Sequence, residues 1–558
     1  MIFIKRRMEN MLHNKRNSWK YIWFIYIGAI AIYLFSAVRM SVPVHLEVDE
    51  ELYLAMAKSF HETGSFQKGY EYINYSCVLY PMLISLGYYF YRPETIMITL
   101  RMINVIVMCS AVFPVYLLSK KILTEKKAIL IAVFSMLIPD MIDSVYLMQE
   151  VFLYPVLMWC FYFIYMDFEK GNRINRYSVL SIVGLATAFF IKTNTLVLIA
   201  AYMLVVILGK KDRRKITKSI CAAGIWTFVV LCGQIGIWIL NAGQGSNHYA
   251  SQIQHLFPIT AETVIAGISG LIFYILFFIF CSGVLPVILP AIYQKEYSEI
   301  DRKFLGFVYS AIGLMLLEIV VTIFLTEEHG SMIPHKFLFR YFFGLTIPLF
   351  IMLGKIEVNM WKKKKWILGS YGLVGVYIAV YYAIIGTETR TAIMDSHITL
   401  LLENINKYVC NGFPVYVMAL FVIGSFIGIG YIIKKKNVQF LIRLFWKMTG
   451  LSVIIMCMIN IFQHPYYSNQ IAEGGRNKNR FIELAEYLKK DDVKIYYLSD
   501  KLDNGALFYG YIWQDYKWID SMDELKDIEE RCVVVTSEEF LEDQKIENLS
   551  KEIEWWVE

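Results

Sequence analysis

The sequence predicts a mainly α-helical membrane protein, with a bundle of about 13 transmembrane spans followed by a small α/β domain. The first observation is composition, because 57% of the 558 residues are hydrophobic, 16% are aromatic and only 18% are charged. The mean hydropathy of +0.47 exceeds what one soluble core accommodates. The second is a series of apolar stretches of about 18 to 25 residues, each able to cross a hydrocarbon core of roughly 30 Å. The third is a change of composition at Gln463, beyond which acidic residues dominate.

The apolar stretches define the spans in order along the chain. Several of them are short, notably 128–139 and 179–191, so the predicted number of spans has a margin of one or two. The first stretch has no clear small-residue cleavage site behind it and is interpreted as an anchor. The expected spans are 21–38, 98–118, 128–139, 146–166, 179–191, 195–208, 219–240, 264–292, 304–325, 337–353, 366–385, 414–433 and 448–462.

Lys and Arg are concentrated in alternate connections between these spans. Since short basic connections stay in the cytoplasm, their alternation predicts the orientation in the plasma membrane. The amino terminus is expected inside and the carboxyl-terminal domain outside the cell. The basic segments are "IKRRMENMLHNKR", "SKKILTEKK", "EKGNRINR", "GKKDRRKITK", "YQKEYSEIDRK", "MWKKKK" and "IKKKNVQFLIRLFWK".

Residues 463–558 are unlike residues 1–462. They contain 12 Lys and Arg against 22 Asp and Glu, a net charge of −10, which leaves the first 462 residues at +16. Within them, "VKIYYLS" and "CVVVTS" are typical of buried strands, and "RFIELAEYLKK" has helical spacing. A soluble extracytoplasmic α/β domain is therefore expected. The chain contains no P-loop or glycine-rich nucleotide fingerprint, so ATP-driven transport is not supported. No nucleic-acid partner is expected.

The first outer loop, residues 39–97, contains an amphipathic segment. Leu52, Met56 and Phe60 recur every four residues, which predicts a helix that begins near Asp49. Such a helix is expected to lie in the membrane interface rather than to cross it. A second interfacial segment is expected over residues 78–91, which are too aromatic and too few for a span.

Asp49 has two interpretations from its position. As the helix N-cap it would accept a backbone hydrogen bond, with Glu50 and Glu51 favourable near the positive end of the helix dipole. As a carboxylate fixed at the membrane surface it would act as a general base. The two roles are compatible, because a capped carboxylate is also a fixed one.

The acid-rich segment after the first span resembles the DExxY-like motif of the GT-C glycosyltransferases. These multi-pass enzymes include protein O-mannosyltransferases and aminoarabinose transferases. Here the motif is "DEELY", with Asp49, Glu50 and Tyr53. Other stretches follow in the family's order: "YPMLISL", "YLMQEVFLYP" around Glu150, "FFIKTNTLVLI" around Lys192, where many relatives have Arg, and "HKFLFRYFFGLTIPLF" with Arg340 and Tyr341. The resemblance covers the membrane half by motif and the tail by architecture.

The resemblance implies a GT-C-like fold and a reaction. Such enzymes take a sugar from a polyprenyl-phosphate donor, usually with inversion, and transfer it to an acceptor on the outer side of the membrane. It implies Asp49 as the base, with Glu50 second and Glu150 as a further catalytic acid. The substrate-binding candidates are Tyr53, Lys192, His335, Lys336, Arg340 and Tyr341.

Most of these candidates also have a plain structural interpretation. Glu150 would make a structural hydrogen bond, Lys192 would reach to the interface, and Arg340 would anchor a helix there. His335 and Lys336 would be solvated loop residues, and Tyr53 would be a packing residue of the amphipathic helix.

A metal ion is an open question at the sequence level. Eight of the nine histidines fall on the predicted outer side, but none has the HxxxH or HxH spacing of a metal site. Some GT-C enzymes use a divalent ion bound by acids and others use none, so no cofactor is assigned.

Two other functions fit parts of the pattern. A flippase or secondary transporter for lipid-linked sugar would also have many spans, but the acidic first loop, the soluble outer domain and the absence of repeats disfavour it. A polysaccharide polymerase or ligase would also use polyprenyl donors, although the acidic motif favours a GT-C enzyme. The expected partners are membrane lipids, the lipid-linked donor and an acceptor that the sequence leaves open: a protein, a lipid or an envelope glycan.

Overall fold

The computed structural model describes most of the first 356 residues and a few segments beyond them. The described ranges are 2–40, 48–68, 71–90, 93–208, 213–244, 246–247, 260–322 and 339–356, isolated residues between 369 and 462, and the strands at 494–498, 516–519, 532–536 and 553–557. The expected spans 366–385, 414–433 and 448–462 lie outside the continuously described residues, as do His335 and Lys336.

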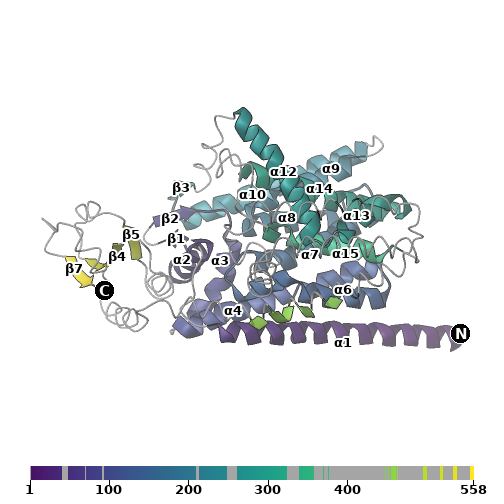
Figure 1. The fold of residues 1–558 in the computed structure, drawn as a ribbon, viewed down its shortest axis with the longest axis horizontal. Coiled ribbons are helices and arrows are strands. Elements are labelled where there is room, and N and C mark those ends of the chain that lie inside the picture. The colour runs from purple at the N-terminus through teal and green to yellow at the C-terminus, as the bar shows by residue number, and fades with distance from the viewer. Residues whose placement is uncertain are drawn as a thin grey trace.

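The described part of the membrane half is a helical bundle (Figure 1). Its helices are α1 (Ile2–Arg39), α2 (Val48–Thr63), α3 (Leu79–Ile84), α4 (Pro93–Cys109), α5 (Val112–Ile122), α6 (Glu125–Leu137), α7 (Glu150–Lys170), α8 (Arg176–Ile191), α9 (Leu196–Ile207), α10 (Arg213–Leu240), α12 (Ala261–Cys281), α13 (Leu285–Ile292), α14 (Glu299–Thr322) and α15 (Phe343–Gly354). Short 3₁₀ helices connect several of them: η1 (Ser85–Tyr89), η2 (Pro139–Val145), η3 (Thr193–Thr195), η4 (Gln294–Glu296) and η6 (Phe339–Tyr341).

Six helices of the described part are long and apolar enough to cross a membrane, or seven if the bent pair α6 and η2 forms one span. The bend between these two is 54° and falls at Pro139, which lacks the N–H that a continuous helix needs. The expected spans at 179–191, 195–208 and 337–353 correspond to the shorter apolar helices α8, α9 and α15. The polytopic helical fold is thus confirmed, whereas the number of 13 spans stays a prediction.

The stretch 264–292, expected as one span, is two helices, α12 and α13. The chain turns between them, with Gly283 at φ +84° and Val284 at φ +56°. Gly283 adopts this left-handed conformation without a steric penalty, and Pro286 lies in the first turn of α13, where its missing N–H costs nothing. Hydropathy alone concealed this break, because Ser282 and Gly283 are flanked on both sides by hydrophobic residues.

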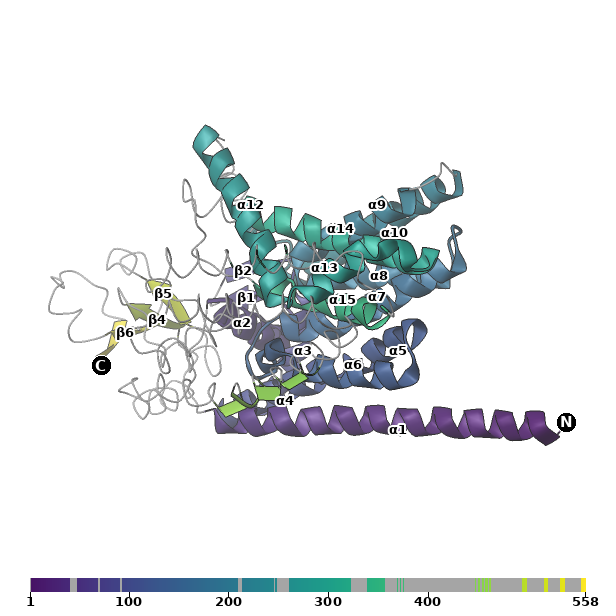
Figure 2. The same cartoon turned by 45° about the vertical axis from the view of Figure 1, so that its right-hand side comes forward.

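Helix α7 forms the centre of the bundle and contacts α4, α5, α8, α14 and α15. Its packing against α8 is close, because a Cβ added at Gly184 would lie 2.8 Å from the Cys160 sulfur. Small residues at such contacts let membrane helices approach one another. Helix α1 runs along one side of the bundle (Figures 1 and 2), where exposed Trp23, Phe24 and Phe35 form a face suited to lipid.

The segments of the first outer loop pack on the end of the bundle. In α2, Tyr53, Met56 and Ala57 are buried, and the helix contacts α3 and η1. The helical segments expected from Asp49 onward and within 78–91 are confirmed, but α2 begins at Val48, so Asp49 lies in the first turn rather than at the N-cap.

A small sheet ties this loop to the end of α10. Strands β1 (Gln67–Lys68) and β2 (Glu71–Asn74) are antiparallel, and β2 pairs in parallel with β3 (Ser246–Asn247). The Asn241 side chain accepts a hydrogen bond from the Phe66 amide at 2.9 Å and donates one to the Ile73 carbonyl at 2.9 Å.

The carboxyl-terminal part contains a four-stranded parallel sheet of order β5-β4-β6-β7. The strands β4 (Lys494–Leu498) and β6 (Cys532–Thr536) confirm the two expected strands, whereas β5 (Tyr516–Ile519) and β7 (Ile553–Val557) were not predicted. Parallel neighbours require crossover connections, which is consistent with an α/β domain. In both views the sheet lies at the end of the molecule where α2 lies, opposite the amino terminus (Figures 1 and 2).

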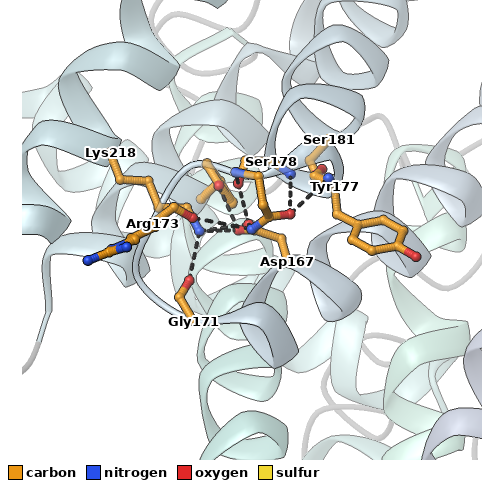
Figure 3. A network of polar contacts seen from close by, with 9 residues as sticks. Asp167, Gly171, Arg173, Tyr177, Ser178, Ser181 and Lys218 are labelled. Atoms are coloured by element: carbon orange, nitrogen blue, oxygen red, sulfur yellow. Dashed lines mark hydrogen bonds and ion pairs between the residues drawn. The ribbon is translucent and has the colours of Figure 1, made fainter.

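A buried polar network joins α7, α8, α9 and α10 (Figure 3). The Asp167 carboxylate is fully buried and pairs with the Lys218 ammonium at 2.7 Å. It also accepts hydrogen bonds from the Tyr202 hydroxyl at 2.8 Å, the Asn175 amide at 2.8 Å and the Ser178 hydroxyl. Asn175 caps α8 through the backbone amides of its first turn. One carboxylate therefore fixes the relative positions of four helices.

Replacing Asp167 with Asn is expected to destabilise the protein by about 3–5 kcal/mol, because it leaves the Lys218 charge buried without its partner. Thermal unfolding in detergent micelles measures the effect. The matched control is Glu169→Gln, which breaks the exposed Lys121–Glu169 pair, 3.2 Å apart, and should cost at most about 1 kcal/mol. The double variant Asp167→Asn/Lys218→Met should recover part of the loss. Equal melting temperatures for Asp167→Asn and Glu169→Gln would contradict the assignment.

Candidate active site

The two acids at the start of α2 point in different directions. Asp49 is half exposed, with 51% of its side-chain surface accessible. Glu50 is 1% exposed and accepts a hydrogen bond from the Leu147 amide at 2.9 Å, which ties α2 to the segment before α7. Consecutive helix residues differ by about 100° around the axis, which explains why one acid faces the open side and the next faces the interior.

Glu150 begins α7 and is 2% exposed. The Lys192 ammonium pairs with its Oε1, and the Arg340 Nε lies 3.7 Å from the same oxygen. A buried carboxylate requires such compensation, and the positive end of the α7 dipole adds to it. Glu150 therefore holds two cations at one point of the bundle.

Arg340 lies between the two acids. Its guanidinium is 3.5 Å from Asp49 Oδ2 and 3.7 Å from Glu150 Oε1, and its side chain is 14% exposed. It belongs to η6, the short helix before α15. One planar cation thus bridges the first outer loop and the central helix α7.

Tyr341 provides an aromatic surface for the cations. The Lys192 ammonium lies 3.8 Å from the centroid of its ring, and the Arg340 guanidinium carbon lies 5.6 Å from it. Lys192 terminates α8 in an extended conformation, which directs the chain into η3. Attraction between a cation and a ring face restrains the long Lys192 side chain.

Tyr53 is buried on the inner face of α2, edge-on to Tyr80 with the ring centroids 5.4 Å apart. Its pKa is raised well above the usual range, chiefly because burial penalises the phenolate. The Asp49 and Glu150 carboxylates raise this pKa further, and Arg340 opposes them. The Tyr53 hydroxyl therefore stays protonated, as a hydrogen-bond donor close to both acids.

Comparison with solved structures identifies the architecture. ArnT from Cupriavidus metallidurans bound to undecaprenyl phosphate matches over 90% of this chain and 87% of its own, with a TM-score of 0.51 at 11% identity. The same protein in the apo state gives a TM-score of 0.50 at 10% identity, over 90% of this chain and 86% of its own. The chain has the GT-C fold.

Two further comparisons accompany this result. Residues 79–238 match the sequence model of the family "Dolichyl-phosphate-mannose-protein mannosyltransferase", which confirms the resemblance to GT-C proteins in the stretch that contains Glu150 and Lys192. The archaeal oligosaccharyltransferase AglB from Archaeoglobus fulgidus gives a TM-score of 0.41 at 11% identity, over 88% of this chain and 64% of its own. No curated protein matches the sequence.

The GT-C fold brings most of the sequence candidates to one place. They come from segments as far apart as α2 and η6. The residues that converge are Asp49, Tyr53, Glu150, Lys192, Arg340 and Tyr341. Glu50 is directed instead toward the Leu147 backbone amide, and His335 and Lys336 lie outside the described residues.

Two charged residues inside apolar spans were missed by the sequence reasoning. Arg101 on α4 is 2% exposed and donates to the carbonyls of Ala37 and Met40, which fixes the end of α1 before the first outer loop. Glu318 lies on α14, and its carboxylate interacts electrostatically with Lys192. A lone charge in an apolar span is a costly feature and was the available signal for both.

Within the described residues, no group of three or more His, Cys, Asp or Glu side chains is arranged to hold a metal ion. The two site acids, Asp49 and Glu150, instead share the Arg340 guanidinium. In this part of the chain the donor set fits charge compensation by protein cations.

Proposed function

We propose that the chain is a glycosyltransferase that moves a sugar from a polyprenyl-phosphate donor to an acceptor hydroxyl outside the cytoplasm, with inversion at the anomeric carbon. The observation that carries the proposal is the arrangement of four charges. An accessible carboxylate, Asp49, lies 3.5 Å from Arg340, and buried Glu150 holds Arg340 and Lys192 beside each other. This combination supplies a base and a cationic site for a leaving phosphate.

Asp49 acts as the base in this mechanism. The acceptor oxygen attacks the anomeric carbon from the face opposite the phosphate, and its proton passes to Asp49. The bond between the anomeric carbon and the phosphate oxygen breaks, and polyprenyl phosphate leaves with the electron pair. The half-exposed position of Asp49 supports access by an acceptor hydroxyl, and the Arg340 guanidinium, 3.5 Å from Asp49 Oδ2, holds the carboxylate in place. Glu50, buried against a backbone amide, has no part in this step.

Arg340 and Lys192 stabilise the charge that develops on the phosphate. Both cations are only 14% exposed, so water screens them less than it screens surface charges. A guanidinium also binds phosphate oxygens in a bidentate manner. Glu150 and the Tyr341 ring position these cations. The protonated Tyr53 hydroxyl is assigned a hydrogen bond to the polyprenyl-phosphate sugar.

The similar proteins support the class of donor. One of the matched structures is ArnT bound to undecaprenyl phosphate, and the matched family is described as a dolichyl-phosphate-mannose-protein mannosyltransferase. Both names contain a polyprenyl phosphate, whose phosphate group a pair of cations near a membrane would bind. The acceptor stays open.

The proposal includes an orientation. The connections α5–α6, α7–α8 and η4–α14 carry basic residues at one end of the bundle, and α2 and the β4–β7 sheet lie at the other (Figures 1 and 2). Since basic connections stay in the cytoplasm, Asp49 and residues 463–558 are assigned to the extracytoplasmic side.

The test is a turnover assay on the purified full chain in phospholipid vesicles. Undecaprenyl phosphate carrying radiolabelled mannose, glucose or galactose is offered together with a crude envelope fraction as acceptor. We expect consumption of one donor, release of undecaprenyl phosphate and a product of inverted anomeric configuration. Movement of label across the bilayer without a glycosidic product would support a transporter and contradict the proposal.

A further inference from the structure

Glu318 is an anomaly in the membrane half. It lies on α14, one of the helices long and apolar enough to span the membrane. Its Oε2 atom is buried and, within the described part of the chain, has no hydrogen-bond partner. A carboxylate oxygen in such surroundings is unfavourable unless a donor reaches it, so Glu318 is a candidate for binding a ligand that supplies a hydrogen-bond donor.

A second acceptor without a partner lies beside it. The buried Oδ1 of Asn194, on η3, also has no hydrogen-bond partner among the described residues. The amide nitrogen of Asn194 contacts the Met315 sulfur at 3.7 Å, which seats η3 on α14. Met315 and Glu318 are three residues apart and share one face of that helix. The two orphaned oxygens therefore belong to neighbouring groups.

This pair adjoins the candidate active site. The Glu318 carboxylate interacts electrostatically with the Lys192 ammonium, which itself pairs with Glu150 and contacts the Tyr341 ring. The Lys192 ammonium pairs with Glu150 and does not donate a hydrogen bond to Glu318 Oε2, which has no donor among the described residues. The open acceptors thus lie next to the cations to which the proposed function assigns the donor phosphate.

Two acceptor oxygens call for a ligand that supplies hydrogen-bond donors close to a phosphate. A sugar attached to that phosphate has hydroxyl groups in this position. We propose that Glu318 and Asn194 bind hydroxyl groups of the donor sugar and select its configuration, an inference that rests on the proposed function. A site that accepts hydrogen bonds from a hydroxyl discriminates against an epimer that directs this hydroxyl elsewhere, because the buried acceptors then stay unpaired.

Equilibrium binding without acceptor tests the inference on the full chain in detergent. The probes are undecaprenyl phosphate and undecaprenyl-phosphate mannose, glucose and galactose; mannose and galactose each differ from glucose in configuration at one carbon. The wild type is expected to prefer one epimer by about tenfold or more, the range of a hydrogen bond to a charged group. Glu318→Ala and Asn194→Ala should each reduce this preference to about threefold or less. In both variants the dissociation constant for bare undecaprenyl phosphate should stay within about threefold of the wild-type value.

Controls separate this role from a structural one. Leu317→Ala removes an exposed side chain from the same helix and should keep the wild-type preference. Glu318→Gln retains one acceptor oxygen and should give an intermediate preference. A wild-type preference in both alanine variants, or no preference in the wild type, overturns the inference alone. Failure of the wild type to bind undecaprenyl phosphate or any of the sugar lipids overturns the proposed function together with it.

Discussion

The Asp49→Asn variant is expected to lose turnover by about 10² to 10⁴, the usual contribution of a general base. Asn has the shape of Asp but does not accept the proton of the attacking hydroxyl. In the proposed mechanism the donor phosphate binds to Arg340 and Lys192 rather than to Asp49, so affinity for undecaprenyl phosphate should be maintained. The measurement is the initial rate of product formation in vesicles, with binding of the bare lipid phosphate determined in parallel.

The control for Asp49 is Glu62→Gln, which removes an exposed acid from the far end of the same helix. It should leave the rate within about twofold of the wild type, in line with the small effect of most surface substitutions. Because Asp49 is half exposed and its pair with Arg340 is long, the variant should also melt at the wild-type temperature. Full activity in Asp49→Asn would remove Asp49 from the mechanism and direct attention to Glu150.

The Arg340→Met variant is expected to lose about 10² to 10³ in turnover, the typical effect of removing one group that stabilises developing charge. Unlike Asp49→Asn, it should also weaken binding of undecaprenyl phosphate. Lys192 stays paired with buried Glu150, so the fold should persist. Rates in vesicles and dissociation constants for the bare lipid phosphate distinguish the two variants.

Graded substitutions make the Arg340 prediction specific. Arg340→Lys keeps the charge but loses the planar fork, and should recover only part of the activity. Arg302→Met removes an exposed cation from the opposite end of the bundle and serves as the control. An Arg340→Met variant that binds undecaprenyl phosphate as the wild type does would contradict the role of this residue in phosphate binding.

The start of α2 shows which features a local sequence pattern predicts and which it does not. The four-residue recurrence of Leu52, Met56 and Phe60 correctly predicted a helix from about Asp49, because burial of one face imposes that spacing. The same pattern did not separate the roles of Asp49 and Glu50. Their separation depends on Leu147, almost 100 residues away, whose amide binds Glu50.

Glu318 shows a different limit. A lone acid within an apolar span was visible in the sequence, but its meaning depends on its neighbours. Asp167, near the carboxyl-terminal end of α7, is also buried, yet its carboxylate binds Lys218, Tyr202, Asn175 and Ser178. Only the packing of the described helices shows that Glu318 retains an oxygen without a hydrogen-bond partner among these residues, whereas Asp167 does not.

The sequence by itself determined the membrane environment, the helical class, the order of the helices and the resemblance to GT-C glycosyltransferases. These properties follow from composition, hydrophobic periodicity and short motifs, which act over neighbouring residues. The tertiary structure alone decided that Arg340 bridges Asp49 and Glu150, that Lys192 lies against Tyr341, and that the run 264–292 breaks at Gly283. Contacts between residues far apart in the chain depend on which helix faces pack together. That choice is made by the shape and charge of the whole bundle, which no local pattern records.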